Sequence, residues 1–226
     1  MIEQTEEPVS LSSSYSTPFA FSIDPPVNMS FLNTFFALNY QSELQLPAKR
    51  GWSAAEMEQL GLKVAIEILH DHKAVIFQNP LVKRATELPP NSPDAVDYKK
   101  LAEEFDSEQD SHAVTPWRQF EIVDELPLIF GYTKNLIYHS ALRGLLDGFE
   151  GFTNAGSGVL LYGAWRVEPA QDGRAVLIVS ETGEVKCNWF LSWYIQMTYP
   201  SSHKVMHAKF RENWEMKMGK AMGQQL

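Results

Sequence analysis

The chain has 226 residues, and its 44% hydrophobic content is enough for the core of one substantial domain. Its 28 acidic residues outnumber its 19 Lys and Arg residues, and the formal net charge of -9 excludes the clustered positive charge of a nucleic-acid-binding surface. The single cysteine, Cys187, allows no internal disulfide and no cysteine-based zinc site, as is typical of proteins from a reducing compartment.

The first segment, residues 1–26, predicts a flexible tail because it mixes Ser, Thr, Glu and Pro without periodicity. It begins with acidic and Ser-rich residues, where a secretory signal has a basic start and an apolar centre. No stretch of the chain approaches the roughly 20 apolar residues of a membrane span. We therefore expect a cytoplasmic protein without an integral membrane segment, folded as one domain over residues 27–220.

A strand is predicted over residues 31–44, where aromatic and branched residues alternate with polar ones. A helix follows, because Ser53 and Glu56 have the spacing of a capping box, in which each side chain accepts a free backbone N–H of the other. The apolar stripe of this helix ends near His70 and His72.

The sequence His70-Asp71-His72 is compatible with a metal site or with a helix end. Two histidines two positions apart point in different directions on a helix, and a histidine interacts favourably with a helix C-terminus. We interpret the motif as a helix end and expect no bound metal. His203 and His207 share a helical face, but the zinc-protease signature also needs a Glu after the first His, so solvated or packed histidines are favoured.

Residues 88–115 are polar, acidic and rich in Pro, and they are too long for an ordinary connection. They predict a mobile flap or a disordered insertion, with a short helix over residues 97–105. Beyond them, strands are predicted at residues 117–126, 134–146, 159–168 and 174–185, separated by turns within residues 147–158 and at 171–173. Consecutive strands joined by tight turns form an antiparallel meander, which is curved or barrel-like and needs a cover on one face.

The end of the chain predicts this cover. Asn188 caps a helix that Pro200 is expected to interrupt or kink, and Ser201 or Ser202 restarts it. Apolar side chains then recur every four residues and predict a stripe buried against a sheet or groove, formed by Met206, Phe210, Trp214 and Met218.

This order of elements resembles the helix-grip fold of the START-like superfamily, which includes polyketide cyclases and aromatases, lipid-transfer domains and plant pathogenesis-related ligand binders. The stretches LHDHKAVIFQNPLV, FEIVDELPLIFG, GAWRVE, VSETGEVKCNWFL and SHKVMHAKF are similar to an uncharacterised fungal branch of it. The resemblance covers residues 28–218 and implies an α+β fold, in which a curved antiparallel sheet wraps around a long C-terminal helix. It also implies an internal cavity for a hydrophobic small molecule or lipid, implies no cofactor, and transfers no catalytic residues.

Candidate site residues follow from strand alternation. His139 and Arg143 share one face of the strand at 134–146, where the imidazole could move a proton and the guanidinium could hold a carbonyl or enolate oxygen. Alternation shows which side chains share a face but not whether that face points into the cavity or to solvent. A solvated outer face for this pair is therefore an equal alternative. Glu181 is expected to act as a base or as a partner of Arg143. The aromatic candidates for binding a substrate are Tyr138, Tyr162, Trp165, Trp189, Trp193 and Tyr194.

Two functions are compatible with these features. The first is a cofactor-free cyclase or isomerase, pericyclic reactions included, for a hydrophobic polyketide- or terpenoid-derived intermediate of fungal secondary metabolism. The second is a non-catalytic carrier or sensor that uses the same cavity. The shared face of His139 and Arg143, a flap that closes the mouth, and the resemblance to cyclases favour the enzyme. The expected partner is a hydrophobic small molecule, and the oligomeric state is left open, a homodimer included.

Overall fold

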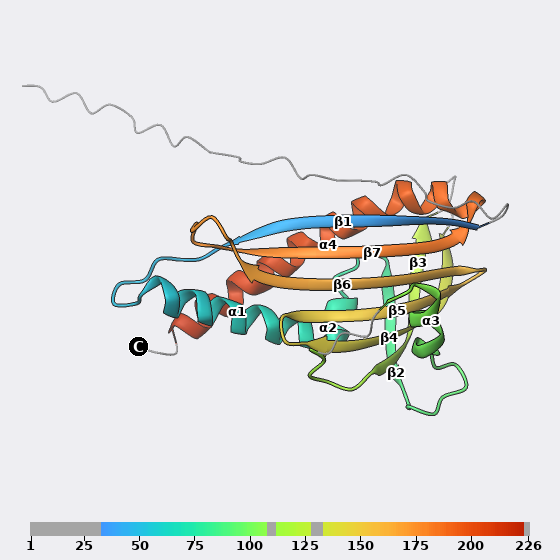
Figure 1. Cartoon of the computed structure of the whole chain (residues 1–226), viewed down its shortest axis with the longest axis horizontal. Helices are drawn as coiled ribbons and strands as arrows, with labels where there is room; N and C mark the ends of the chain where they lie inside the picture. The colour runs from blue at the N-terminus through green and yellow to red at the C-terminus, as the bar shows by residue number, and fades with distance from the viewer. Residues whose placement is uncertain (1–32, 108–111, 128–132, 224–226) are drawn as a thin grey trace, which may run out of the picture.

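The computed structural model describes residues 33–107, 112–127 and 133–223, so the predicted tail at 1–26 lies outside the described residues. Seven antiparallel strands form one sheet in the order β1-β7-β6-β5-β4-β3-β2 (Figure 1). The strands are β1 (Asn33–Gln45), β2 (Val82–Leu88), β3 (Arg118–Pro127), β4 (Thr133–Leu145), β5 (Gly148–Gly156), β6 (Val159–Pro169) and β7 (Val176–Asn188). The helices are α1 (Ala54–His70), α2 (His72–Ile76), α3 (Tyr98–Glu104) and α4 (Trp189–Gly223).

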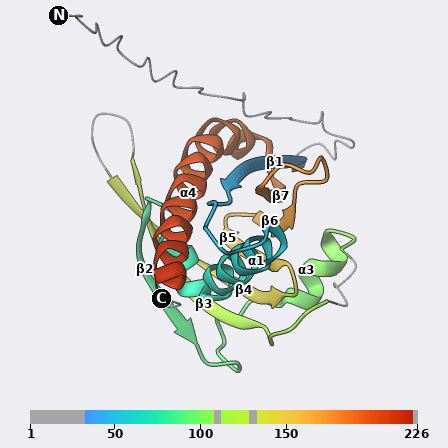
Figure 2. The same cartoon turned by 90° about the vertical axis from the view of Figure 1, so that its left-hand side faces the viewer.

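The sheet is curved, and its two faces are covered by different helices. Figure 2 shows α1 and α4 inside the curve, on what we call the inner face, whereas α3 lies on the opposite, outer face. A curved antiparallel sheet with a long C-terminal helix confirms the predicted α+β class and is consistent with a helix-grip arrangement.

The main core lies between the inner face, α1 and the second half of α4. The capping box begins α1 as predicted, because the Ser53 hydroxyl accepts from the N–H of Glu56 at 3.2 Å and the Glu56 carboxylate accepts from the N–H of Ser53 at 2.7 Å. The predicted stripe on α4 is confirmed, since all four of its side chains are buried. Each such apolar side chain contributes roughly 1.5–3 kcal/mol on burial, so this core stabilises the junction of α4 with the sheet.

Helix α4 runs without interruption through Pro200, so of the predicted interruption or kink there, the interruption is wrong. Proline removes one backbone hydrogen bond, but hydroxyl groups on both sides of it bond to carbonyls of the preceding helical turns. The Thr198 hydroxyl donates to the carbonyl of Tyr194 at 2.8 Å, and the Ser202 hydroxyl donates to that of Tyr199 at 3.0 Å. Because both halves of α4 also pack on the inner face, the helix continues.

Two strands were absent from the sequence prediction. The glycine-rich stretch expected to contain only a turn forms β5, and Gly148 explains why glycine is needed there: a Cβ at this position would lie 1.8 Å from the carbonyl oxygen of Trp165. Strand β2 is too polar for an apolar pattern to reveal it. Ion pairs join it to β3, with Arg84 at 2.7 Å from Glu121.

Residues 96–105 of the segment at 88–115 pack on the outer face, and this part of it is therefore not the expected flap over a cavity mouth. Its short helix α3 begins as predicted, with the Asp97 carboxylate accepting from the N–H of Lys100 at 3.2 Å. Leu101 and Phe105 are buried with Phe152 of β5 in a small outer cluster. Burying these apolar side chains away from water is favourable, and this burial holds α3 against the sheet.

Candidate functional site

A groove of about 450 Å³ lies between the inner face of the sheet and the first half of α4. Strands β2 to β7, helix α2 and the loop after it supply one side, and α4 supplies the other. Most of the lining is apolar and includes Val75, Ile122, Leu126, Leu136, Leu142, Phe149, Leu161, Leu191, Ile195 and Met206. The groove therefore offers a mainly hydrophobic space of the size that small-molecule sites have.

Strand β4 presents Tyr138 and Ser140 to the groove, which places His139 and Arg143 on the outer face. His139 lies beside Glu121, with Nε2 at 3.9 Å from the nearer carboxylate oxygen. The expectation that His139 and Arg143 act inside the cavity is therefore wrong, and the alternative of an outer-face position holds. The reason is that side chains alternate strictly along a strand, so a shift of one residue reverses the face.

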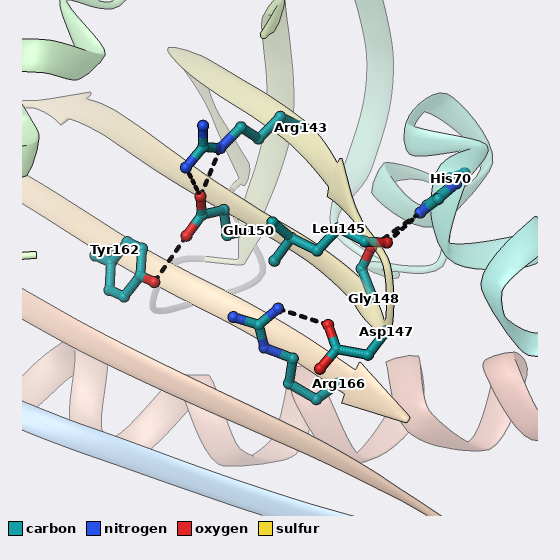
Figure 3. Close-up of polar contacts among 8 residues, drawn as sticks. All are labelled: His70, Arg143, Leu145, Asp147, Gly148, Glu150, Tyr162 and Arg166. Carbon is teal, nitrogen blue, oxygen red and sulfur yellow. Dashed lines mark hydrogen bonds and ion pairs between the residues drawn. The ribbon is translucent and has the colours of Figure 1, made fainter. Parts of the chain in front are cut away.

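Arg143 forms a buried network on the outer face, drawn in Figure 3. Its Nε donates to Glu150 at 2.6 Å, and the hydroxyl of Tyr162 donates to the other oxygen of that carboxylate at 3.0 Å. The guanidinium lies over the ring of Trp117, 4.6 Å from the ring centre. Burial and the negative charge of Glu150 raise the pKa of Tyr162 to about 12. The partner of Arg143 is thus Glu150 and not Glu181, and Tyr162, although it borders the groove, directs its hydroxyl away from it.

The His-Asp-His motif is a helix end, as interpreted from the sequence. Helix α1 ends at His70, and the carboxylate of Asp71 accepts from the N–H of Ala74 at the start of α2. The Nε2–H of His70 donates to the carbonyls of Leu145 and Gly148, at 2.9 and 3.1 Å, and so holds the turn between β4 and β5 (Figure 3). No three His, Cys, Asp or Glu side chains of the described ranges are grouped so that they could hold a metal ion.

Glu181 of β7 is buried and lines the groove next to two histidines of α4. His203 Nδ1 lies 2.6 Å from one carboxylate oxygen and His207 Nε2 lies 3.3 Å from the other. Burial alone raises the pKa of Glu181, but the charges and hydrogen bonds of His203 and His207 outweigh it and lower this pKa to about 2. The negative charge of Glu181 is therefore compensated within the protein. Sequence reasoning named Glu181 but did not connect it with these histidines.

A second carboxyl group, Asp124 of β3, lines the groove, and no Lys, Arg or His side chain of the described residues pairs with it. It is 6% exposed and accepts the hydroxyl of Tyr138, whose oxygen lies 3.2 and 3.3 Å from the two carboxylate oxygens. Burial raises the pKa of Asp124 to about 6, although the hydrogen bond from Tyr138 acts in the opposite direction. Sequence reasoning missed Asp124, but a signal was present: it falls two residues after Ile122 on the apolar face of the strand.

The remaining aromatic candidates divide between the groove and the exposed side of α4. Tyr194 lines the groove, as do Trp165 of β6 and Tyr138 of β4. Trp189 and Trp193 are 51% and 69% exposed and lie outside the groove lining, so the prediction that they form a cavity wall is wrong. The two tryptophans are four residues apart and share a helical face, whereas the next residue, Tyr194, is turned by about 100°.

A family model described as Domain of unknown function (DUF7053) matches residues 58–216, which is more than two thirds of the chain. The match extends from α1 into the second half of α4 and includes every strand that lines the groove. No curated protein matches the chain. None of the helices in the described part of the chain is both long enough and apolar enough to cross a membrane.

Proposed function

The chain belongs to the family described as a domain of unknown function (DUF7053), and we propose that it binds a hydrophobic small molecule in the groove beneath α4. The observation that carries this proposal is the groove itself, a volume of about 450 Å³ with a mainly apolar lining. Water in such a space is readily displaced by a ligand that buries apolar surface. The resemblance to the START-like superfamily, which implies a hydrophobic ligand between the sheet and the last helix, supports the same function.

A carrier or sensor fits the groove better than the enzyme that the sequence favoured. Two of the three arguments for an enzyme concerned His139 with Arg143 and the segment at 88–115. His139, Arg143 and residues 96–105 of that segment lie on the outer face. Binding needs only the apolar lining and a few polar groups that orient the ligand, both of which the groove has.

A cofactor-free cyclase or isomerase is a second candidate, and one observation favours it. The two carboxyl groups of the groove have pKa values displaced in opposite directions, to about 6 for Asp124 and about 2 for Glu181. A pair of this kind can divide the roles of proton donor and proton acceptor. On this reading a polyketide- or terpenoid-derived substrate would react in the groove, and Asp124→Asn and Glu181→Gln would each lower turnover by roughly 10² to 10⁴-fold.

The binding function is tested with the neutral fluorescent probe N-phenyl-1-naphthylamine. We expect its emission to rise on titration with the wild-type protein and to report one saturable site. Ala155 of β5 lines the groove, and Ala155→Trp should fill part of the space and abolish or strongly weaken the binding.

Thr182→Trp is the matched control, because Thr182 is exposed on the outer face of β7 and the same side chain there leaves the groove open. Loss of probe binding in Ala155→Trp but not in Thr182→Trp supports the groove as the site. Equal binding by the two variants, or no saturable binding by the wild type, would exclude the proposed function.

A further inference from the structure

We infer that Asp124 is the counter-ion for the protonated amine of a hydrophobic amine bound in the groove. This inference rests on the proposed binding function and adds the chemical class of the ligand. The carboxyl group of Asp124 is buried and faces the groove. Among the described residues, its hydrogen-bond partner is one hydroxyl, that of Tyr138.

Asp124 has no positively charged partner among the described residues. All Lys, Arg and His residues of the chain lie within the described residues, because residues 1–32, 108–111, 128–132 and 224–226 contain none. None of these described cationic side chains forms an ion pair with Asp124. A buried carboxylate without a positive partner is costly, since the protein replaces water with an apolar surrounding. What the carboxyl of Asp124 lacks is therefore a positive charge.

The two carboxyl groups of the groove differ in how their negative charge is compensated. Glu181 is also buried, but His203 and His207 lie within 3.3 Å of its oxygens and compensate it. A cation that enters the groove gains little at this compensated group. At Asp124 the same cation forms a charge-assisted hydrogen bond that no protein group supplies.

An ammonium group suits Asp124 better than a metal ion or a neutral alcohol does. A divalent metal ion needs about six oxygen ligands, and no three His, Cys, Asp or Glu side chains of the described residues are grouped so that they could hold one. A neutral alcohol would supply a second hydroxyl where Tyr138 already donates one, and it would leave the charge uncompensated. A primary ammonium supplies both the charge and three N–H donors.

The neighbouring side chains fit an ammonium with an apolar body. Ile122 and Leu126 flank Asp124 on the same face of β3, and Leu136 lies opposite it on β4. The oxygen of the Tyr138 hydroxyl is available as a second acceptor. Its ring can also attract a cation. Hydrocarbon contacts thus begin directly beside the charged group, as an amphipathic amine requires.

The test uses the displacement of N-phenyl-1-naphthylamine by dodecylamine, dodecanol and dodecanoate, which share one chain and differ in the head group. In 150 mM NaCl, and below the concentrations at which they form micelles, we expect dodecylamine to displace the probe from the wild type about tenfold more tightly than the other two, because a hydrogen bond between charged groups typically contributes that much or more. In Asp124→Asn the three competitors should differ by less than about twofold.

Two variants make this test specific. Glu125→Gln removes the same charge from the next residue of β3, whose side chain pairs with Lys83 on the outer face, and it should keep the preference for the amine. Tyr138→Phe removes the hydroxyl and keeps the carboxylate, so it should lower the preference for the amine less than Asp124→Asn does. The comparison of the three competitors on the wild type needs no variant and stands even if Asp124→Asn does not fold.

The two proposals fail in different ways. If the probe does not bind the wild type, the proposed function is wrong and this inference with it. If the probe binds but dodecylamine is not preferred, or if Asp124→Asn retains the preference, the groove binds a hydrophobic molecule and Asp124 is not its counter-ion.

Discussion

The inner and outer faces of the same four strands, β3 to β6, use similar side chains for different purposes. On the outer face, the carboxylate of Glu150 is paired with Arg143, and the apolar side chains are packed against α3. On the inner face, the bond that the described residues give to the carboxyl of Asp124 comes from one hydroxyl, and about 450 Å³ remains unfilled beside it.

This difference indicates where a ligand can act. A buried polar group that already has its full set of partners stabilises one structure, and a ligand can add little to it. A buried polar group without charge compensation that faces an open space can gain much from a partner of the right chemistry. Buried charge by itself is therefore a poor guide to function, whereas buried charge that lacks a partner is a better one.

The largest effect is expected from breaking the outer ion pair. Arg143→Met leaves Glu150 buried without a positive partner and should lower the free energy of unfolding by about 3–5 kcal/mol, measured by urea denaturation. The double variant Arg143→Met with Glu150→Gln should recover much of this loss, because it removes both charges. Probe binding should persist in the folded single variant, and its loss would mean that Arg143 contributes to the groove after all.

A matched pair of leucines tests the packing of the two faces. Leu101→Ala, in α3, removes a buried side chain from the outer cluster and should lower the free energy of unfolding by about 3 kcal/mol. Leu161→Ala, in the groove, should cost only about 1 kcal/mol, because that side chain already borders open space. Thermal unfolding compares the two variants, and a larger loss for Leu161→Ala would show that the groove is closed and packed in solution.

The pH dependence of stability should separate Asp124 from Glu181. Asp124 keeps its proton up to about pH 6 in the folded chain but only to about pH 3.8 when unfolded, so the free energy of unfolding falls by up to about 3 kcal/mol as the pH rises between these values. Asp124→Asn should remove this fall. The pKa of Glu181 is lowered, so its contribution has the opposite sign and is lost as the pH falls below about 4.5. Urea titrations at several pH values measure both, and an unchanged profile in Asp124→Asn would contradict the raised pKa.

The smallest effect is expected at His139. Its side chain is partly exposed and lies 3.9 Å from Glu121 on the outer face, so His139→Ala should change the free energy of unfolding by less than about 0.5 kcal/mol. Probe binding should also be unchanged. A strong loss of probe binding in this variant would instead show that His139 contributes to the groove, as the first expectation from strand alternation had it.

Local patterns in the sequence were sufficient for several elements. The Ser53 and Glu56 capping box, the start of α3 at Asp97 and the buried stripe from Met206 to Met218 all depend on contacts within a few residues or on one helical period. Each of these three features is encoded in neighbouring residues, and so it can be read without knowledge of the rest of the chain. The α+β class was implied by the resemblance of the order of elements to the helix-grip fold.

The site required the tertiary structure. Alternation grouped His139 with Arg143 correctly, but only the long-range packing of α4 and α3 decided that this group faces outward. The same packing turned Trp189 and Trp193 to the exposed side of α4 and brought Glu181 to His203. Periodicity tells which side chains share a face, whereas the direction of that face depends on which distant element buries it, and this information lies in no single stretch of the sequence.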